Sequence, residues 1–208
     1  MAIVVGFVLT TLVGGWWAAV LQQRSWIRQN DVRMREAENQ RAGTACQDLM
    51  TLLDKRLFRM HRLLGATTAR ARGAASEDVL EERLREYDEV VIAWNERLNM
   101  NLSLVGSHFG DVARAYLEGL YEEFRRVGLR VESAVRVARD GGDPASIAAD
   151  AEGEFEGRDP GSLNDRVYQF GLMLMGQLRE GTVGRYAPNK SIPRTADKLS
   201  APQVDPGP

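Results

Sequence analysis

Charged and apolar residues are distributed very unevenly along this chain. Residues 2–21 (AIVVGFVLTTLVGGWWAAVL) include no charged side chain. As an α-helix rising about 1.5 Å per residue, this run would be about 30 Å long, the thickness of a bilayer's hydrocarbon core. Trp16 and Trp17 lie near its end and Trp26 follows it, where tryptophan rings settle among lipid headgroups. We therefore predict one transmembrane helix within residues 1–21.

Two other interpretations of this apolar run were weighed. A cleaved signal peptide would need a basic segment, a shorter apolar core and small residues at a cleavage site, whereas only Met1 precedes the run and tryptophans lie near its end. A helix buried in a protein core rarely lacks a polar face. Inside the run, Gly14 and Ala18 form a small-x-x-x-small pair, which lets two membrane helices approach closely.

The basic residues that flank the run predict its orientation. None precedes it, and four arginines follow it closely: Arg24, Arg28, Arg33 and Arg35. The positive-inside rule then places the body of the chain in the cytoplasm and the N-terminus outside, as a single-pass protein of the inner (plasma) membrane. We expect Arg24, Trp26 and Arg28 to contact lipid headgroups.

The pattern after the run is helical. Residues 22–43 are polar and contain no proline or glycine before Gly43, so we predict a helical stalk that continues the membrane helix. Lys55, Arg56, Arg59 and Arg62 are assigned to the outer face of the helix that follows. Its inner face is predicted from apolar residues at intervals of three and four: Ala42, Cys46, Leu49, Leu53, Leu57, Met60 and Leu64.

Capping residues and similar stripes predict further helices. Ser76, followed by two acids, is expected to begin the second helix and Asp111 the third. Ser162-x-x-Asp165 resembles a capping box for the last one, and Asp143-Pro144 predicts a short helix over Ala145–Ala151. The predicted inner residues are Leu80, Leu84, Tyr87, Val91, Trp94, Leu98 and Val105; Tyr116, Leu120, Phe124, Val127, Val131, Val135 and Ala138; and Leu163, Val167, Phe170, Leu174 and Leu178.

These elements predict an all-α fold without strands. We divide it into a transmembrane anchor (1–21), a juxtamembrane stalk (22–43), an antiparallel bundle of about four helices (44–181) and a disordered, proline-rich tail (182–208). On the outer face of the third helix, Glu122–Arg126 and Glu132–Arg136 are expected to pair at the four-residue separation.

Composition narrows the possible functions. The net charge is −2, so no overall basic field indicates nucleic acid as a partner. Cys46 is the only cysteine, which excludes an internal disulfide or a cysteine-based metal site, and we expect it to be a small core residue. Arginine outnumbers lysine 24 to 3, which is typical of a high-GC bacterial genome.

Motifs for catalysis or metal binding are missing from the sequence. Di-iron bundles need Glu-x-x-His, but Phe58 precedes His61 and Val105 precedes His108 by three residues. We expect no metal and no cofactor, and a surface position for His61. His108, in a predicted GSHFG turn, is kept as a weak candidate for a ligand site or a pH switch. A cluster of asparagines is expected to fix helix register: Asn95, Asn99 and Asn101.

The sequence thus favours a membrane-anchored helical scaffold or interaction protein without catalytic activity. Its expected partners are the lipid bilayer and either another protein or a second copy of itself. Two alternatives stay open. One is an effector or channel-accessory subunit that assembles through its anchor, although the run offers almost no polar face to line a pore. The other is an enzyme whose site is built in the bundle without a linear motif.

Overall fold

The structure is a computed structural model that describes the backbone of residues 2–156 and 161–187. Side chains are described from residue 22 onward, except those of residues 24, 25, 27, 28, 156 and 186. Every regular element within these ranges is helical. The predicted all-α class and the helical bundle are therefore confirmed.

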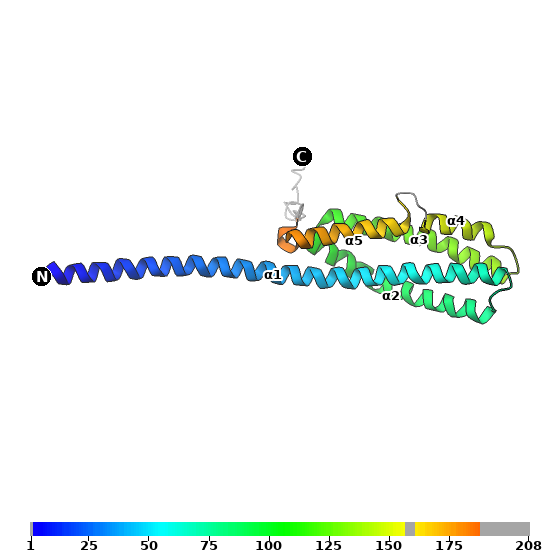
Figure 1. Ribbon diagram of the computed structural model, residues 1–208, viewed down its shortest axis with the longest axis horizontal. Coiled ribbons are helices and arrows are strands. Elements are labelled where there is room, and N and C mark those ends of the chain that lie inside the picture. The colour runs from blue at the N-terminus through cyan, green and yellow to red at the C-terminus, as the bar shows by residue number, and fades with distance from the viewer. Residues whose placement is uncertain (1, 157–160, 188–208) are drawn as a thin grey trace, which may run out of the picture.

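The described chain forms a bundle with one very long helix (Figure 1). The second half of α1 packs against α2 and α3, and α4 and α5 follow one another along the remaining side. Successive helices α1, α2 and α3 reverse direction at short connections (Figure 1). The elements are α1 (Ala2–Ala71), α2 (Glu77–Phe109), α3 (Asp111–Arg139), α4 (Ala145–Glu156), α5 (Leu163–Glu180) and the short 3-10 helix η1 (Gly184–Tyr186).

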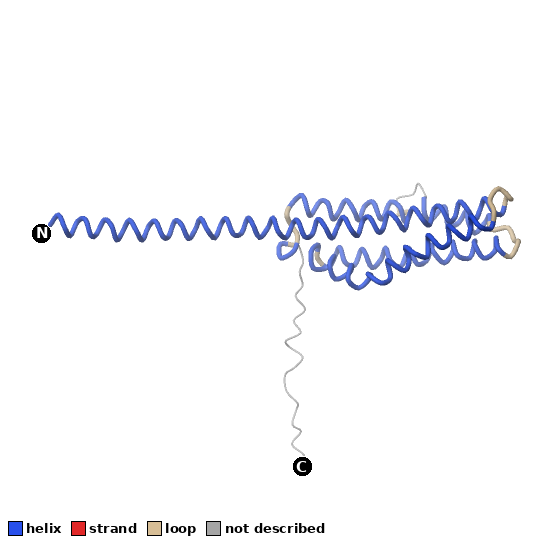
Figure 2. Tube along the Cα trace, turned by 90° about the horizontal axis from the view of Figure 1, so that it is seen from below, coloured by secondary structure: helices blue, strands red, loops and turns tan. Residues whose placement is uncertain are grey.

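Helix α1 joins the apolar run, the polar segment and the first bundle helix without a break, as predicted. Its 70 residues correspond to a length of about 105 Å at 1.5 Å per residue. The N-terminal part extends alone beyond the bundle, as both views show (Figures 1 and 2). Among the side chains of α1 that the structure describes, the first buried one is that of Ala42. The bundle is thus carried at one end of a long, free helical arm.

The predicted anchor forms the beginning of α1, but its side chains lie outside the described residues. The same holds for Gly14 and Ala18 and for Arg24 and Arg28. Trp26 is described, and its side chain is 65% exposed. Among the residues whose side chains are described, no helix is both long and apolar enough to cross a membrane.

The predicted inner faces meet in one hydrophobic core. All seven predicted residues of the first bundle helix are buried, including Cys46, and so are six of the seven on α3, with Tyr116 half-buried. On α2 the stripe is less deep, because Leu84, Val91 and Leu98 are only partly buried against the core. The largest fully buried side chains are Trp94, Tyr87, Phe109, Phe124 and Phe170.

Two of the predicted helix starts can be compared at atomic level. Ser162 caps α5, where its hydroxyl accepts a hydrogen bond from the Asp165 backbone N–H at 3.3 Å, as the capping box predicted. Ser76 occupies the cap position of α2, but its side chain makes no capping hydrogen bond. The acids Glu77 and Asp78 do lie in the first turn of α2, where the helix dipole favours them.

Several predicted boundaries are wrong. The GSHFG segment is not a turn, because α2 continues through Phe109 and the chain reverses at Gly110 alone, with φ at 88°. Helix α4 extends beyond Ala151 to Glu156, since Phe155 is buried in the core. The segment after Gly181 packs against α1 and α2 through η1, with Val183 buried. Residues 188–208 of the predicted tail lie outside the described residues.

The predicted salt bridges on α3 are also wrong in detail. Glu122 pairs with Arg125 at 3.0 Å instead of with Arg126. Arg126 and Arg130 both approach Glu154 of α4, at 3.4 Å and 2.8 Å. Two arginines of α3 thus pair with one carboxylate of α4. The spacing of charges within a single helix cannot predict such a contact between helices.

Candidate functional site

The residues singled out in the sequence do not come together in one place. His108 lies half-buried in the last turn of α2, with its ring edge-on to Phe109 at 6.4 Å between centroids. His61 is exposed on α1, as expected, and stacks on Phe155 of α4 at 5.8 Å. Among the described residues, no group of three or more histidines, cysteines or carboxylates is arranged to bind a metal ion.

The asparagine cluster divides between core and solvent. Asn95 and Asn99 are exposed, whereas Asn101 is buried, and its side-chain nitrogen has no hydrogen-bond partner among the described residues. Of the three asparagines, only Asn101 lies where it could fix helix register. Its side-chain nitrogen bonds to no described residue, so the predicted contact across helices stays a prediction.

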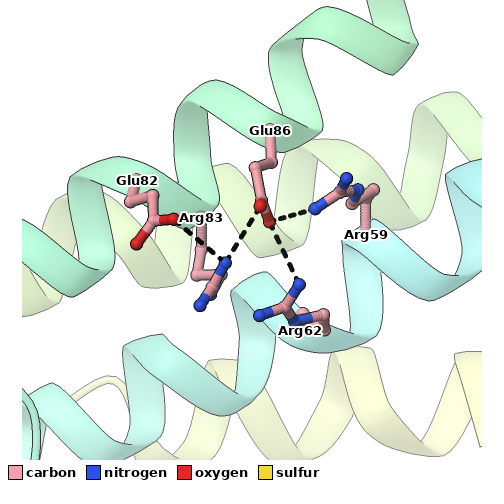
Figure 3. A network of polar contacts seen from close by, with 5 residues as sticks. All are labelled: Arg59, Arg62, Glu82, Arg83 and Glu86. Atoms are coloured by element: carbon pink, nitrogen blue, oxygen red, sulfur yellow. Dashed lines mark hydrogen bonds and ion pairs between the residues drawn. The ribbon is translucent and has the colours of Figure 1, made fainter.

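Helices α1 and α2 are joined by a network of arginines around one carboxylate (Figure 3). Glu86 of α2 pairs with Arg59 of α1, with Arg62 of α1 at 3.4 Å and with Arg83 of its own helix at 3.0 Å. Hydrogen bonding to Arg59, followed by that to Arg83, lowers the pKa of Glu86 to about 2. These side chains lie partly in solvent, and the network fastens α2 to α1.

One arginine of α1 differs from all these surface pairs. Arg56 is only 4% exposed, although the sequence pattern assigned it to the outer face. Its guanidinium carbon lies 4.6 Å from the centroid of the Phe124 ring and 5.6 Å from that of Trp94. The cation is therefore held against two aromatic rings, one from α3 and one from α2.

The buried guanidinium lacks a full set of acceptors. Its Nε and Nη1 atoms have no hydrogen-bond partner among the described residues, while the nearby Tyr87 side chain favours the charged form of the group. No carboxylate of the described residues forms an ion pair with it. Burial lowers the pKa of Arg56, an effect that Tyr87 and Tyr121 partly offset. Burial likewise raises the pKa of Tyr87, which Arg56 opposes.

A cavity of about 200 Å³ adjoins this arginine between α1, α2 and α3. Its wall is mixed, with aromatic and aliphatic surface beside a few polar groups. The lining residues are Arg56, Tyr87, Val91, Asn95, Tyr121, Phe124, Arg125, Gly128, Leu129 and Glu132. We call this the Arg56 cavity. Here a buried arginine with unpaired nitrogen atoms lines a cavity. We therefore take the Arg56 cavity as the candidate binding site.

The spacing of apolar residues does indicate the buried position of Arg56, although the sequence analysis assigned this residue to the outer face. Arg56 follows Leu53 by three residues and precedes Met60 by four, which places it on the buried stripe. Assigning every charged residue to the outer face concealed that position. The same spacing applied without regard to residue type would have marked Arg56 as a buried charge.

Comparison with known proteins gives no functional assignment. The chain matches no protein-family model, no curated protein and no solved structure.

Proposed function

We propose that this protein is a membrane-tethered helical scaffold, in which residues 2–21 anchor the chain in the inner membrane and the bundle lies on the cytoplasmic side. The observation that carries the proposal is the continuity of α1. One helix leads from an uncharged run, through an exposed polar segment, into the bundle core. A rigid connection of this kind holds the bundle at a fixed distance from whatever binds the run.

The exposed segment supports this arrangement. Of its described side chains, those from 29 to 36 are all exposed, and no other described helix runs beside α1 there (Figure 2). At 1.5 Å per residue, residues 22–41 separate the run from the first buried position by about 30 Å. The arginines that follow the run favour the cytoplasmic side for the bundle. The function is then to present the bundle to a protein partner near the membrane surface.

Anchoring is tested by the fractionation of cells that express the full chain and two variants. Val8→Arg with Val13→Arg places two charges in the run, which costs several kcal/mol for a membrane helix. Val32→Arg with Met34→Arg adds the same charge at exposed positions of the polar segment. We expect the first variant to leave the membrane fraction and the second to stay with it. Equal fractionation of both would contradict the anchor.

Orientation and scaffolding need separate measurements. A reporter that is active only outside the cytoplasm, fused after Pro208, should stay silent. Replacing residues 2–21 with an unrelated transmembrane helix should preserve the proteins that crosslink to the bundle in cells, as identified by mass spectrometry. If the crosslinked set changes with the anchor sequence, the partners are selected in the membrane and the bundle is not the binding module.

A further inference from the structure

The Arg56 cavity contains a charge that the bundle does not neutralise. Taking a guanidinium out of water costs several kcal/mol, and a buried cation is normally paired with a carboxylate or fully hydrogen-bonded. Stacking on Trp94 and Phe124 recovers part of this cost, because a cation is attracted to the face of an aromatic ring. The unpaired Nε and Nη1 atoms remain uncompensated. Both atoms are closed off from solvent, so an acceptor from outside the described chain can reach the guanidinium only where Arg56 lines the cavity.

The cavity is accessible from solvent. Four of its lining residues are exposed and mark its opening: Asn95, Arg125, Leu129 and Glu132. Its inner end is formed by buried side chains, among them Tyr87, Phe124 and Arg56 itself. An apolar cavity of about 150 Å³ is enough to hold a benzene molecule. The Arg56 cavity, at about 200 Å³, therefore accommodates a ligand of similar size that carries one polar group.

Charge limits what this ligand can be. Arg125 at the opening is already paired with Glu122 at 3.0 Å, so it adds little free positive charge. Glu132 at the same opening opposes the entry of anions. Glu132 is not paired with Arg56 among the described residues, so the cation at the inner end still lacks a contacting carboxylate, and one carboxylate would supply it. A phosphate dianion would exceed that charge and would meet a largely aromatic and aliphatic wall.

We propose that the Arg56 cavity binds a small monocarboxylate with an aromatic or aliphatic body. The carboxylate accepts hydrogen bonds from the Arg56 guanidinium, the planar donor group that suits this acceptor. The body of the ligand packs among Tyr121, Val91 and Leu129 towards the opening. The aromatic rings beneath Arg56 hold the cation in place before the ligand arrives. This site is independent of the membrane anchor.

Benzoate is the probe for this proposal, and the experiment uses the full chain in mild detergent. Titration calorimetry should show saturable binding of one benzoate per chain. Benzamide has the same shape without the charge and should not bind, and inorganic phosphate should not bind either. In the NMR spectrum of arginine side chains, the Nε–H signal that is absent from Arg56→Met belongs to Arg56. In the native chain, this signal should shift when benzoate is added. That assignment links binding to the buried cation.

Three variants separate a built site from general anion attraction. Arg56→Met should weaken benzoate binding by about tenfold or more, because charge-assisted hydrogen bonds to the carboxylate are lost. Asn95→Trp at the exposed opening should weaken binding by filling the cavity while leaving Arg56 in place. Arg130→Met, which removes an arginine of α3 outside the cavity, should leave affinity unchanged. Absence of saturable binding overturns the proposal, as does equal affinity in Arg56→Met, or phosphate binding in place of benzoate.

Discussion

At the scale of single side chains, Arg56 is a buried cation without a paired carboxylate among the described residues. Replacing a buried, incompletely paired charge by a hydrophobic residue of similar size is often neutral or stabilising, by about 1–4 kcal/mol. We therefore expect Arg56→Met to leave the free energy of unfolding unchanged or to raise it. Urea denaturation of the full chain in detergent, followed by circular dichroism, measures the difference.

Trp94 provides the contrasting substitution for that experiment. It is fully buried beneath Arg56, so Trp94→Ala leaves a large void and should cost about 3–5 kcal/mol. If Arg56→Met destabilises the bundle as strongly as Trp94→Ala, the guanidinium is a structural element, and its unpaired nitrogens have partners outside the described residues.

Glu86 makes the stability of the α1–α2 contact depend on pH. Its pKa is lowered to about 2 in the folded chain, from an ordinary value of 4.5 for glutamate. A lowered pKa contributes stability above the unfolded value, and that stability is lost as pH falls towards the folded value. We expect Glu86→Gln to be less stable than the native chain at pH 7, with a difference that shrinks between about pH 5 and pH 2.

The control for this pH dependence is another glutamate of the same network. Among the described residues, Glu82 forms an ion pair with Arg83 alone, at 3.5 Å, and it is more exposed than Glu86. Glu82→Gln should therefore change the unfolding midpoint little at any pH. A Glu86→Gln difference that stays constant from pH 7 to pH 2 would mean that the lost contact is not electrostatic.

At the scale of helices, Gly128 in the middle of α3 leaves space for the Tyr87 hydroxyl of α2. A Cβ at Gly128 would lie 2.8 Å from the Tyr87 hydroxyl oxygen, closer than real Cβ contacts come. Gly128→Ala should therefore destabilise the native chain, although alanine favours helix by about 0.5–1 kcal/mol over glycine. In a Tyr87→Phe background the clash is removed, and the same substitution should then stabilise. A double-mutant cycle by urea denaturation measures this coupling.

Gly65 on α1 is the matched control for that cycle. It is exposed in mid-helix, and nothing lies within 4 Å of an added Cβ. Gly65→Ala should stabilise by about 0.5–1 kcal/mol in both backgrounds. If the changes in unfolding free energy of Gly128→Ala and Tyr87→Phe are additive, the Tyr87 ring can move away from an added Cβ. Gly128 would then not be what holds the Tyr87 hydroxyl near Arg56.

The helices themselves could be read from the sequence because their apolar spacing is regular over many turns. The α3 stripe from Leu120 to Ala138 is buried throughout, and the Ser162 cap forms as predicted. Contacts between helices could not be predicted from this spacing. Glu154 attracts two arginines of α3, and Phe155 extends α4 into the core, through contacts that only the assembled bundle creates. The Arg56 cavity arises in the same way, from three helices that each contribute part of its wall.

At the scale of the whole molecule, the bundle and the arm have different surfaces. The bundle buries its stripes in one core, whereas the arm ahead of Ala42 leaves its described side chains largely exposed (Figure 1). Trp26, Val32 and Met34 are among the exposed apolar residues of this arm. A helix this polar either bridges through solvent or pairs with another helix. In a membrane, copies share one plane, which raises their effective concentration.

We therefore expect two copies to associate in parallel along the arm. If residues 2–21 span the membrane as proposed, the small-x-x-x-small pair Gly14 and Ala18 would allow close approach there, and exposed apolar residues such as Trp26 and Met34 would supply contact beyond it. Repulsion between the arginines that follow the run opposes this pairing, and anionic lipid partly neutralises it. Single cysteines introduced from Gln22 to Gln40, in a Cys46→Ala background, should crosslink between copies in native membranes with a period near 3.6 residues. A uniform low yield at every position would show that the arm is monomeric. A period of 3.6 that survives Gly14→Leu with Ala18→Leu would instead place the contact in the arm alone, outside the membrane.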